Sequence, residues 1–114
     1  MLLRATHRDA GKVTVIDLSG RITLGEGSAL LRKTIRTLLE EQRTRLLLNL
    51  GDVDYIDSSG IGELVSAFTA VKGSGGEMKL LNLTRKVRDI LQITKLYTVF
   101  DVHSDENTAL RSFS

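Results

Sequence analysis

The chain reads LLLNLGDVDYIDSSGIG over residues 46–62, and the interpretation of the whole sequence depends on this stretch. The nearly uninterrupted apolar run at 46–50 is typical of a central strand that is covered on both faces. A polar turn over residues 52–59 is expected next, and apolar residues then recur at helical spacing. The stretch therefore predicts a strand, a short polar turn and a helix over residues 58–72.

Two serines, Ser58 and Ser59, stand at the predicted start of this helix, where free backbone N–H groups and the helix dipole favour an anion. One interpretation is a plain helix cap, with an effect of about 1 kcal/mol. The other is a hydroxyl to which a phosphate is added and removed. Gly60 and Gly62 would let another molecule approach closely, or would let the helix lie tightly on the sheet. The residues alone leave both pairs of alternatives open.

Further elements follow on either side of this stretch. A β-hairpin of residues 2–8 and 12–19 is expected to be broken at Ser19-Gly20, and an amphipathic helix is expected over residues 25–42. The remaining expected elements are a strand at 78–83, a helix capped by Thr84, a short strand at 99–102 and a weak helix at 105–111. The two central helices are expected to face the sheet through Leu31, Ile35, Leu38 and Leu39, and through Ile61, Leu64, Val65 and Phe68.

This order of elements predicts an α/β fold. The opening hairpin is antiparallel, while the later β-α-β units require parallel neighbours with right-handed crossovers. The result is a mixed sheet with helices packed against it, and the 52–59 segment lies just past the carboxyl end of a strand, where functional groups of parallel units gather.

Composition restricts the possible functions further. The length of 114 residues fits a single domain over residues 1–114, and the chain contains no cysteine for disulfides or zinc sites. No signal peptide or membrane span is expected, which predicts a cytoplasmic protein. Basic residues cluster at 32–36, 43–45 and 85–88 and are interpreted as solvated helix faces and helix C-terminal charges. Aromatic residues are only 4%, so nucleic acid is not an expected partner.

Several enzyme signals are weak. Three aspartates between residues 52 and 57 could suit Mg²⁺, but Asx-turn chemistry is the favoured interpretation. Ser58 could serve as the nucleophile of a small hydrolase if His7 or His103 lay beside it, although no G-x-S-x-G elbow occurs. No glycine-rich nucleotide motif appears. We expect no enzyme activity, no metal site and no cofactor.

The DSSGIG motif at 57–62, following a leucine-rich strand, resembles the STAS domain, and more narrowly the single-domain anti-sigma factor antagonists of bacteria. LSGRI at 18–22, LNL at 48–50 and GGEM at 75–78 extend the resemblance over nearly the full length. By position, the resemblance implies that Ser58 is the phosphoacceptor and Ser59 the helix cap. It also implies a phosphorylation loop that contacts the partner through Asp57, Ser59, Gly60, Ile61 and Gly62.

A second partner loop is implied at Gly20, Arg21, Ile22 and Thr23. Members of the family often carry an acidic residue here, as in G-E-L-D, and Arg21 departs from that pattern. The departure is expected to change which kinase is recognised.

The resemblance further implies a switch between partners. The unphosphorylated form would bind an anti-sigma factor that is also a serine kinase, and so release a sigma factor. The kinase would bring ATP and Mg²⁺, phosphorylation of Ser58 would end binding, and a phosphatase would restore it. The alternative is an unphosphorylated regulatory or scaffold subunit of a transporter or lipid-export complex. Neither reading includes direct contact with nucleic acid or insertion into a membrane.

Overall fold

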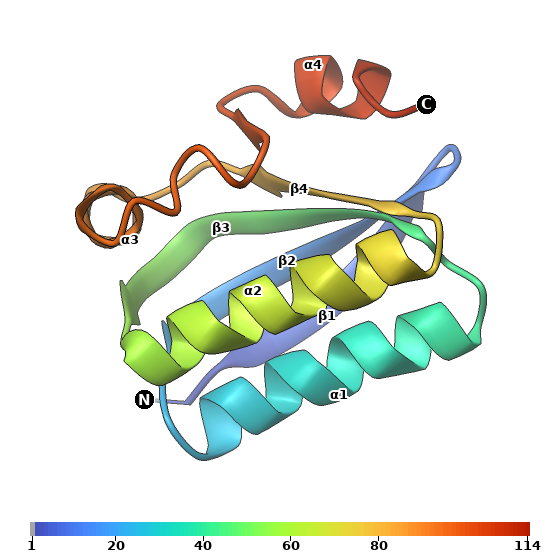
Figure 1. Ribbon diagram of the computed structural model, residues 1–114. Helices are drawn as coiled ribbons and strands as arrows, with labels where there is room; N and C mark the ends of the chain where they lie inside the picture. Colours follow the sequence, from blue (N-terminus) through green and yellow to red (C-terminus); the bar gives the residue numbers. More distant parts are fainter. Residues whose placement is uncertain (1) are drawn as a thin grey trace.

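The computed structural model describes residues 2–114, and its elements follow the predicted order of strands and helices (Figure 1). The five strands form one mixed sheet in the order β1-β2-β3-β4-β5, in which only the β1–β2 pair is antiparallel. The elements are β1 (Arg4–Ala10), β2 (Val13–Ile22), α1 (Glu26–Glu40), β3 (Arg45–Ile56), α2 (Ser58–Gly73), β4 (Glu77–Leu81), α3 (Arg85–Ile93), β5 (Val102–His103) and α4 (Glu106–Arg111).

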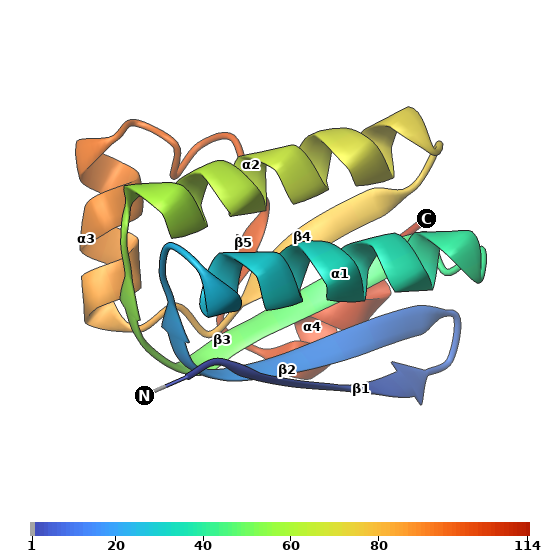
Figure 2. The same ribbon diagram turned by 90° about the horizontal axis from the view of Figure 1, so that it is seen from below.

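Helices cover both faces of the sheet. α1 and α2 lie side by side under one face, α4 lies on the other, and α3 stands at the end of the sheet where α2 begins (Figures 1 and 2). Within residues 2–114 no helix has the length and apolar character that crossing a membrane requires.

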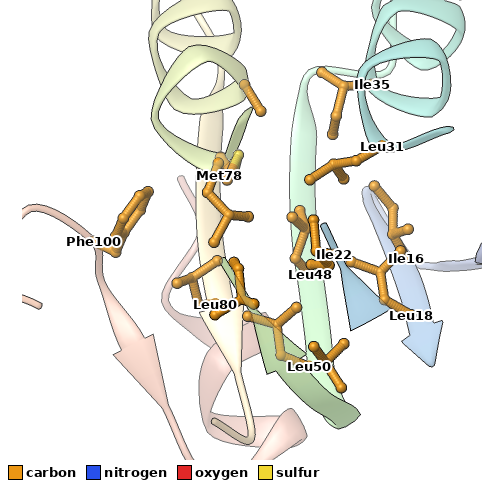
Figure 3. Close-up of a cluster of buried hydrophobic side chains, with 14 of the residues drawn as sticks. Ile16, Leu18, Ile22, Leu31, Ile35, Leu48, Leu50, Met78, Leu80 and Phe100 are labelled. Atoms are coloured by element: carbon orange, nitrogen blue, oxygen red, sulfur yellow. The ribbon is translucent and has the colours of Figure 1, made fainter. Parts of the chain in front are cut away.

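The central strand β3 contributes to a core on each side of the sheet, as the apolar run predicted. Leu46, Leu48 and Leu50 belong to the large core under α1, α2 and α3, part of which Figure 3 shows. Leu47 belongs to a smaller core under α4, together with Val15 and Ala109. Alternate side chains of a strand point to opposite faces, so a strand that is buried on both faces is apolar at nearly every position.

The predicted helix faces are confirmed. Leu31, Ile35 and Leu38 of α1 are buried, as are Ile61 and Leu64 of α2. The other predicted residues are partly buried and pack against the same core; these are Leu39, Val65 and Phe68. Helical periodicity was sufficient to find the registers because both helices lie with one side on the sheet.

The predicted polar turn over residues 52–59 is wrong in its first half. β3 continues to Ile56 and pairs with the end of β2, Ile22 opposite Ile56. Val53 and Ile56 are buried, while Asp52 and Asp54 are exposed. The acidic residues therefore occupy the solvent side of a strand, and only Asp57 separates that strand from α2.

The predicted break at Ser19-Gly20 is also wrong, because β2 passes through it and ends at Ile22. The hairpin strands are Arg4–Ala10 and Val13–Ile22 and not 2–8 and 12–19. Gly20 has a φ of 107° and a side chain there would collide with the carbonyl oxygen of Leu2. This glycine therefore admits a backbone crossing over the strand and does not end it.

The last strand is shorter and later than the predicted 99–102. β5 comprises only Val102–His103, which pair with the end of β4. Phe100 is buried and packs edge-on against Phe68, with ring centroids 5.4 Å apart. The apolar residues before β5 therefore cover the core from an irregular segment, which the alternation pattern cannot distinguish from a strand.

Candidate functional site

Asp57 caps α2 and also holds the neighbouring loop. Its carboxylate accepts a hydrogen bond from the backbone N–H of Gly60 at 2.8 Å and another from that of Leu24 at 3.0 Å. Its own N–H donates to the carbonyl of Ile22 at 3.3 Å. The N–H of Gly60, helped by that of Leu24, holds the pKa of the Asp57 carboxyl below its ordinary value. The prediction that Ser59 is the helix cap is therefore wrong.

Ser58 and Ser59 differ sharply in environment. Ser58 is the first residue of α2 and is exposed. Ser59 is half-buried, and its hydroxyl lies 3.3 Å from that of Ser28 in α1, which in turn donates to the carbonyl of Thr23 at 3.0 Å. Because Asp57 provides the cap and Ser59 joins the two helices, Ser58 is the serine whose hydroxyl faces outward.

Packing requires glycine at only one of the two glycine positions of the motif. A side chain at Gly60 would collide with the carbonyl oxygen of Ile22 and with the side chain of Ile56. A side chain at Gly62 would meet nothing within 4 Å, and this residue is exposed. The fold therefore requires glycine at position 60 so that α2 can lie tightly on the sheet, whereas packing does not explain the glycine at position 62.

The two predicted partner segments meet at the end of β2. Gly20, Arg21 and Ile22 belong to this strand, so the expected loop Gly20–Thr23 is a loop only at Thr23. Ile22 is buried and joins Asp57, while the exposed Arg21 has its guanidinium 4.9 Å from the ring centroid of Tyr55. The structure brings the two predicted segments together, but neither is a loop: Gly20–Ile22 is strand, and residues 58–62 form the start of α2.

Leu24 and Tyr55 also belong to this site and were missed from the sequence. Leu24 is 80% exposed on the loop between β2 and α1, and Tyr55 is exposed at the end of β3. The sequence signal that could have identified Leu24 is an apolar residue in a loop segment, between Thr23 and Gly25. Neither periodicity nor composition shows that such a leucine is left uncovered.

The geometry gives no support to the enzyme alternatives. Strand pairing places His103 level with Asn49 of β3, and His7 level with Leu48. From these two positions to Ile56, where β3 ends just before Ser58, an extended strand covers about 23–26 Å, far beyond hydrogen-bond reach. Across residues 2–114, histidine and acidic side chains nowhere gather in a group of three that could hold a metal ion.

Comparison with known proteins gives a consistent result. The family model described as "STAS domain" matches residues 5–109. The anti-sigma-B factor antagonist of Bacillus subtilis is 34% identical over 87 residues, which cover 76% of this chain and 78% of that protein. The crystal structure of an anti-sigma factor antagonist from Mycobacterium paratuberculosis has a TM-score of 0.86 at 19% identity, covering 97% of this chain and 93% of that chain.

A further solved structure is that of the Bacillus cell fate determinant SpoIIAA in its phosphorylated form. It has a TM-score of 0.73 at 21% identity and covers 95% of this chain and 97% of that chain. At this level of identity the likeness concerns the fold alone.

Proposed function

This chain belongs to the STAS domain family, and from that membership we propose that it acts as an anti-sigma factor antagonist. In its unphosphorylated form it binds an anti-sigma factor that is also a serine kinase, and so releases a sigma factor. Phosphorylation of Ser58 ends this binding, and a phosphatase restores it. The kinase brings the ATP and Mg²⁺.

The observation that carries the proposal is that different residues cap α2 and present a free hydroxyl at its start: Asp57 is the cap, and Ser58 is exposed. Asp57 supplies the cap, so the exposed hydroxyl of Ser58 can be modified without loss of a helix-capping bond. Two other candidate acceptors are engaged in internal contacts. The hydroxyl of Ser59 faces Ser28, and that of Thr84 donates to a carbonyl of β3 at 2.8 Å.

The same arrangement gives a phosphate at Ser58 a strong effect on binding to the partner. A phosphate adds about −1.5 to −2 charges. The N–H of Gly60 is already bound by the carboxylate of Asp57, so the new charge stands beside an existing one, and the partial positive charge of the helix N-terminus offsets only part of it. An unmatched charge in the middle of a protein interface costs a few kcal/mol, which corresponds to a loss of affinity of about 10²-fold.

Two variants of Ser58 test the switch. Ser58→Ala should fold as the parent chain does, bind the anti-sigma factor and keep the sigma factor released in cells. Ser58→Asp should fold well, because it adds a carboxylate to the first turn of a helix, yet bind at least about tenfold more weakly. Thr69→Asp is a matched control, because Thr69 is exposed on the same helix about 16 Å further along its axis.

The measurements are calorimetric binding to the anti-sigma factor, melting curves of each variant, and mass spectrometry of the 46–72 peptide after incubation with the kinase and ATP. Equal affinities of Ser58→Ala and Ser58→Asp would refute the switch. Phosphate found only on Ser59 or Thr84 would refute the choice of acceptor.

A further inference from the structure

We propose that Leu24 is an apolar anchor of this interface, inserted into an apolar recess on the kinase beside its active site. The inference rests on the proposed function and adds to it the residue and the surface chemistry by which the partner is held. Leu24 lies outside the Gly20–Thr23 segment that the sequence suggested.

Residues with exposed apolar side chains lie around the end of β2. Among residues 2–114, the large hydrophobic side chains that are exposed are Leu2, Leu24, Tyr55, Ile93 and Val99. Three of them surround this end: the Leu2 backbone crosses over Gly20, Tyr55 stacks on Arg21, and the N–H of Leu24 is bound by Asp57. Exposed apolar side chains that gather beside polar groups are typical of protein interaction sites.

The backbone holds Leu24 in place although its side chain is free. The carboxylate of Asp57 binds the Leu24 N–H, the N–H of Ser28 donates to the carbonyl of Thr23 at 2.9 Å, and that of Ala29 donates to the carbonyl of Gly25 at 3.0 Å. Because the backbone is already fixed, covering the side chain of Leu24, which is 80% exposed, costs side-chain entropy but no further backbone entropy.

The chemistry of phosphoryl transfer places the partner over this residue. The kinase must bring the γ-phosphate of ATP in line with the hydroxyl of Ser58. Ser58 directly follows Asp57, and that same carboxylate binds the N–H of Leu24. The rim of the kinase active site therefore covers Leu24, and a desolvated aliphatic anchor in such a place carries a large share of the binding energy.

The test compares Leu24→Ala and Leu24→Met with Val99→Ala. Val99 is a matched control because it is also an exposed aliphatic residue. It lies near Phe68 and Lys72, which belong to the second half of α2, far from the Ser58 end of that helix. The probes are the purified anti-sigma factor kinases encoded by the host of this chain, each loaded with ADP and Mg²⁺ for calorimetry and with ATP for phosphorylation of Ser58.

Leu24→Ala should bind at least about tenfold more weakly and raise the KM for phosphorylation with kcat unchanged, while Leu24→Met keeps most of the affinity. Melting temperatures should stay within about 2 °C of the parent. Binding within twofold of the parent, or a fall in kcat at constant KM, would overturn the anchor while leaving the proposed function intact. A parent chain that none of these kinases binds or phosphorylates would instead overturn the proposed function, and the anchor with it.

Discussion

Replacing Asp57 with alanine removes the cap of α2 and the hydrogen bond that ties this cap to the β2–α1 loop, and we expect it to destabilise the protein by about 1–3 kcal/mol. Loss of a helix cap costs about 1 kcal/mol, with a range of about 0.5–2. The bond to the N–H of Leu24 involves a charged acceptor, which adds about 0.5–1 kcal/mol at this half-exposed place. For a domain of this size the sum lowers the melting temperature by about 4–12 °C.

Asparagine at the same position should give an intermediate result. It is as good a cap as aspartate, so its carbonyl can still accept from the N–H of Gly60. Its amide group cannot accept from the N–H of Leu24, and the cost should be about 1 kcal/mol. The stability lost from aspartate to asparagine therefore measures the bond to Leu24, and the further loss from asparagine to alanine measures the helix cap.

The pH dependence follows from the lowered pKa of Asp57. A carboxyl whose pKa is lower in the folded than in the unfolded state stabilises the fold above its unfolded pKa of about 3.9. This contribution is lost as the pH falls through the folded pKa. The difference in stability between the parent and Asp57→Ala should therefore be constant near neutrality and shrink in acid.

The assay is urea unfolding of the parent, Asp57→Asn and Asp57→Ala from pH 7 down to about pH 3. Asp54→Ala serves as the control, because Asp54 is exposed on β3. A cost below about 0.5 kcal/mol for Asp57→Ala at neutral pH would contradict the tethering role. A difference that did not change in acid would contradict the role of the charge.

Further expected outcomes concern the packing of α2. Leu64→Ala should cost about 2–5 kcal/mol by denaturant unfolding, because Leu64 is fully buried, whereas Ser66→Ala on the exposed side should stay within about 0.5 kcal/mol. Gly60→Ala should severely destabilise or unfold the protein, since its methyl group would collide with the carbonyl of Ile22. Gly62→Ala should stabilise by up to about 1 kcal/mol, and a destabilised Gly62→Ala would show an unrecognised constraint there.

Much of the fold could be predicted because its parts follow periodicity. The apolar run at 46–50 marked a strand buried on both faces, and the stripes of α1 and α2 marked their inward sides. The end of β3 could not be predicted in this way. Aspartate is typical of turns, so Asp52 and Asp54 favoured a turn in the sequence. Only the pairing of residues 52–56 with the end of β2 makes this segment a strand.

The start of α2 was predicted at the correct residue, but its cap was not. Aspartate and serine are nearly equivalent caps, so DSS offers three candidates that only the backbone conformation can distinguish. Sequence spacing also left the reason for the two glycines open. The approach of Ile22 to Gly60 involves residues far apart along the chain, which spacing cannot reveal.

The positions of the two chain ends bear on how this domain can be joined to other molecules. The Leu2 backbone crosses over Gly20, beside the Ser58 end of the sheet. The backbone of Ser114 bonds instead to Arg45 and Glu77, at the amino ends of β3 and β4, so the two ends lie apart (Figure 1). A fluorophore, affinity tag or fused domain at the carboxyl end would therefore leave the site open. The same addition at the amino end would stand beside the surface that we propose for the partner.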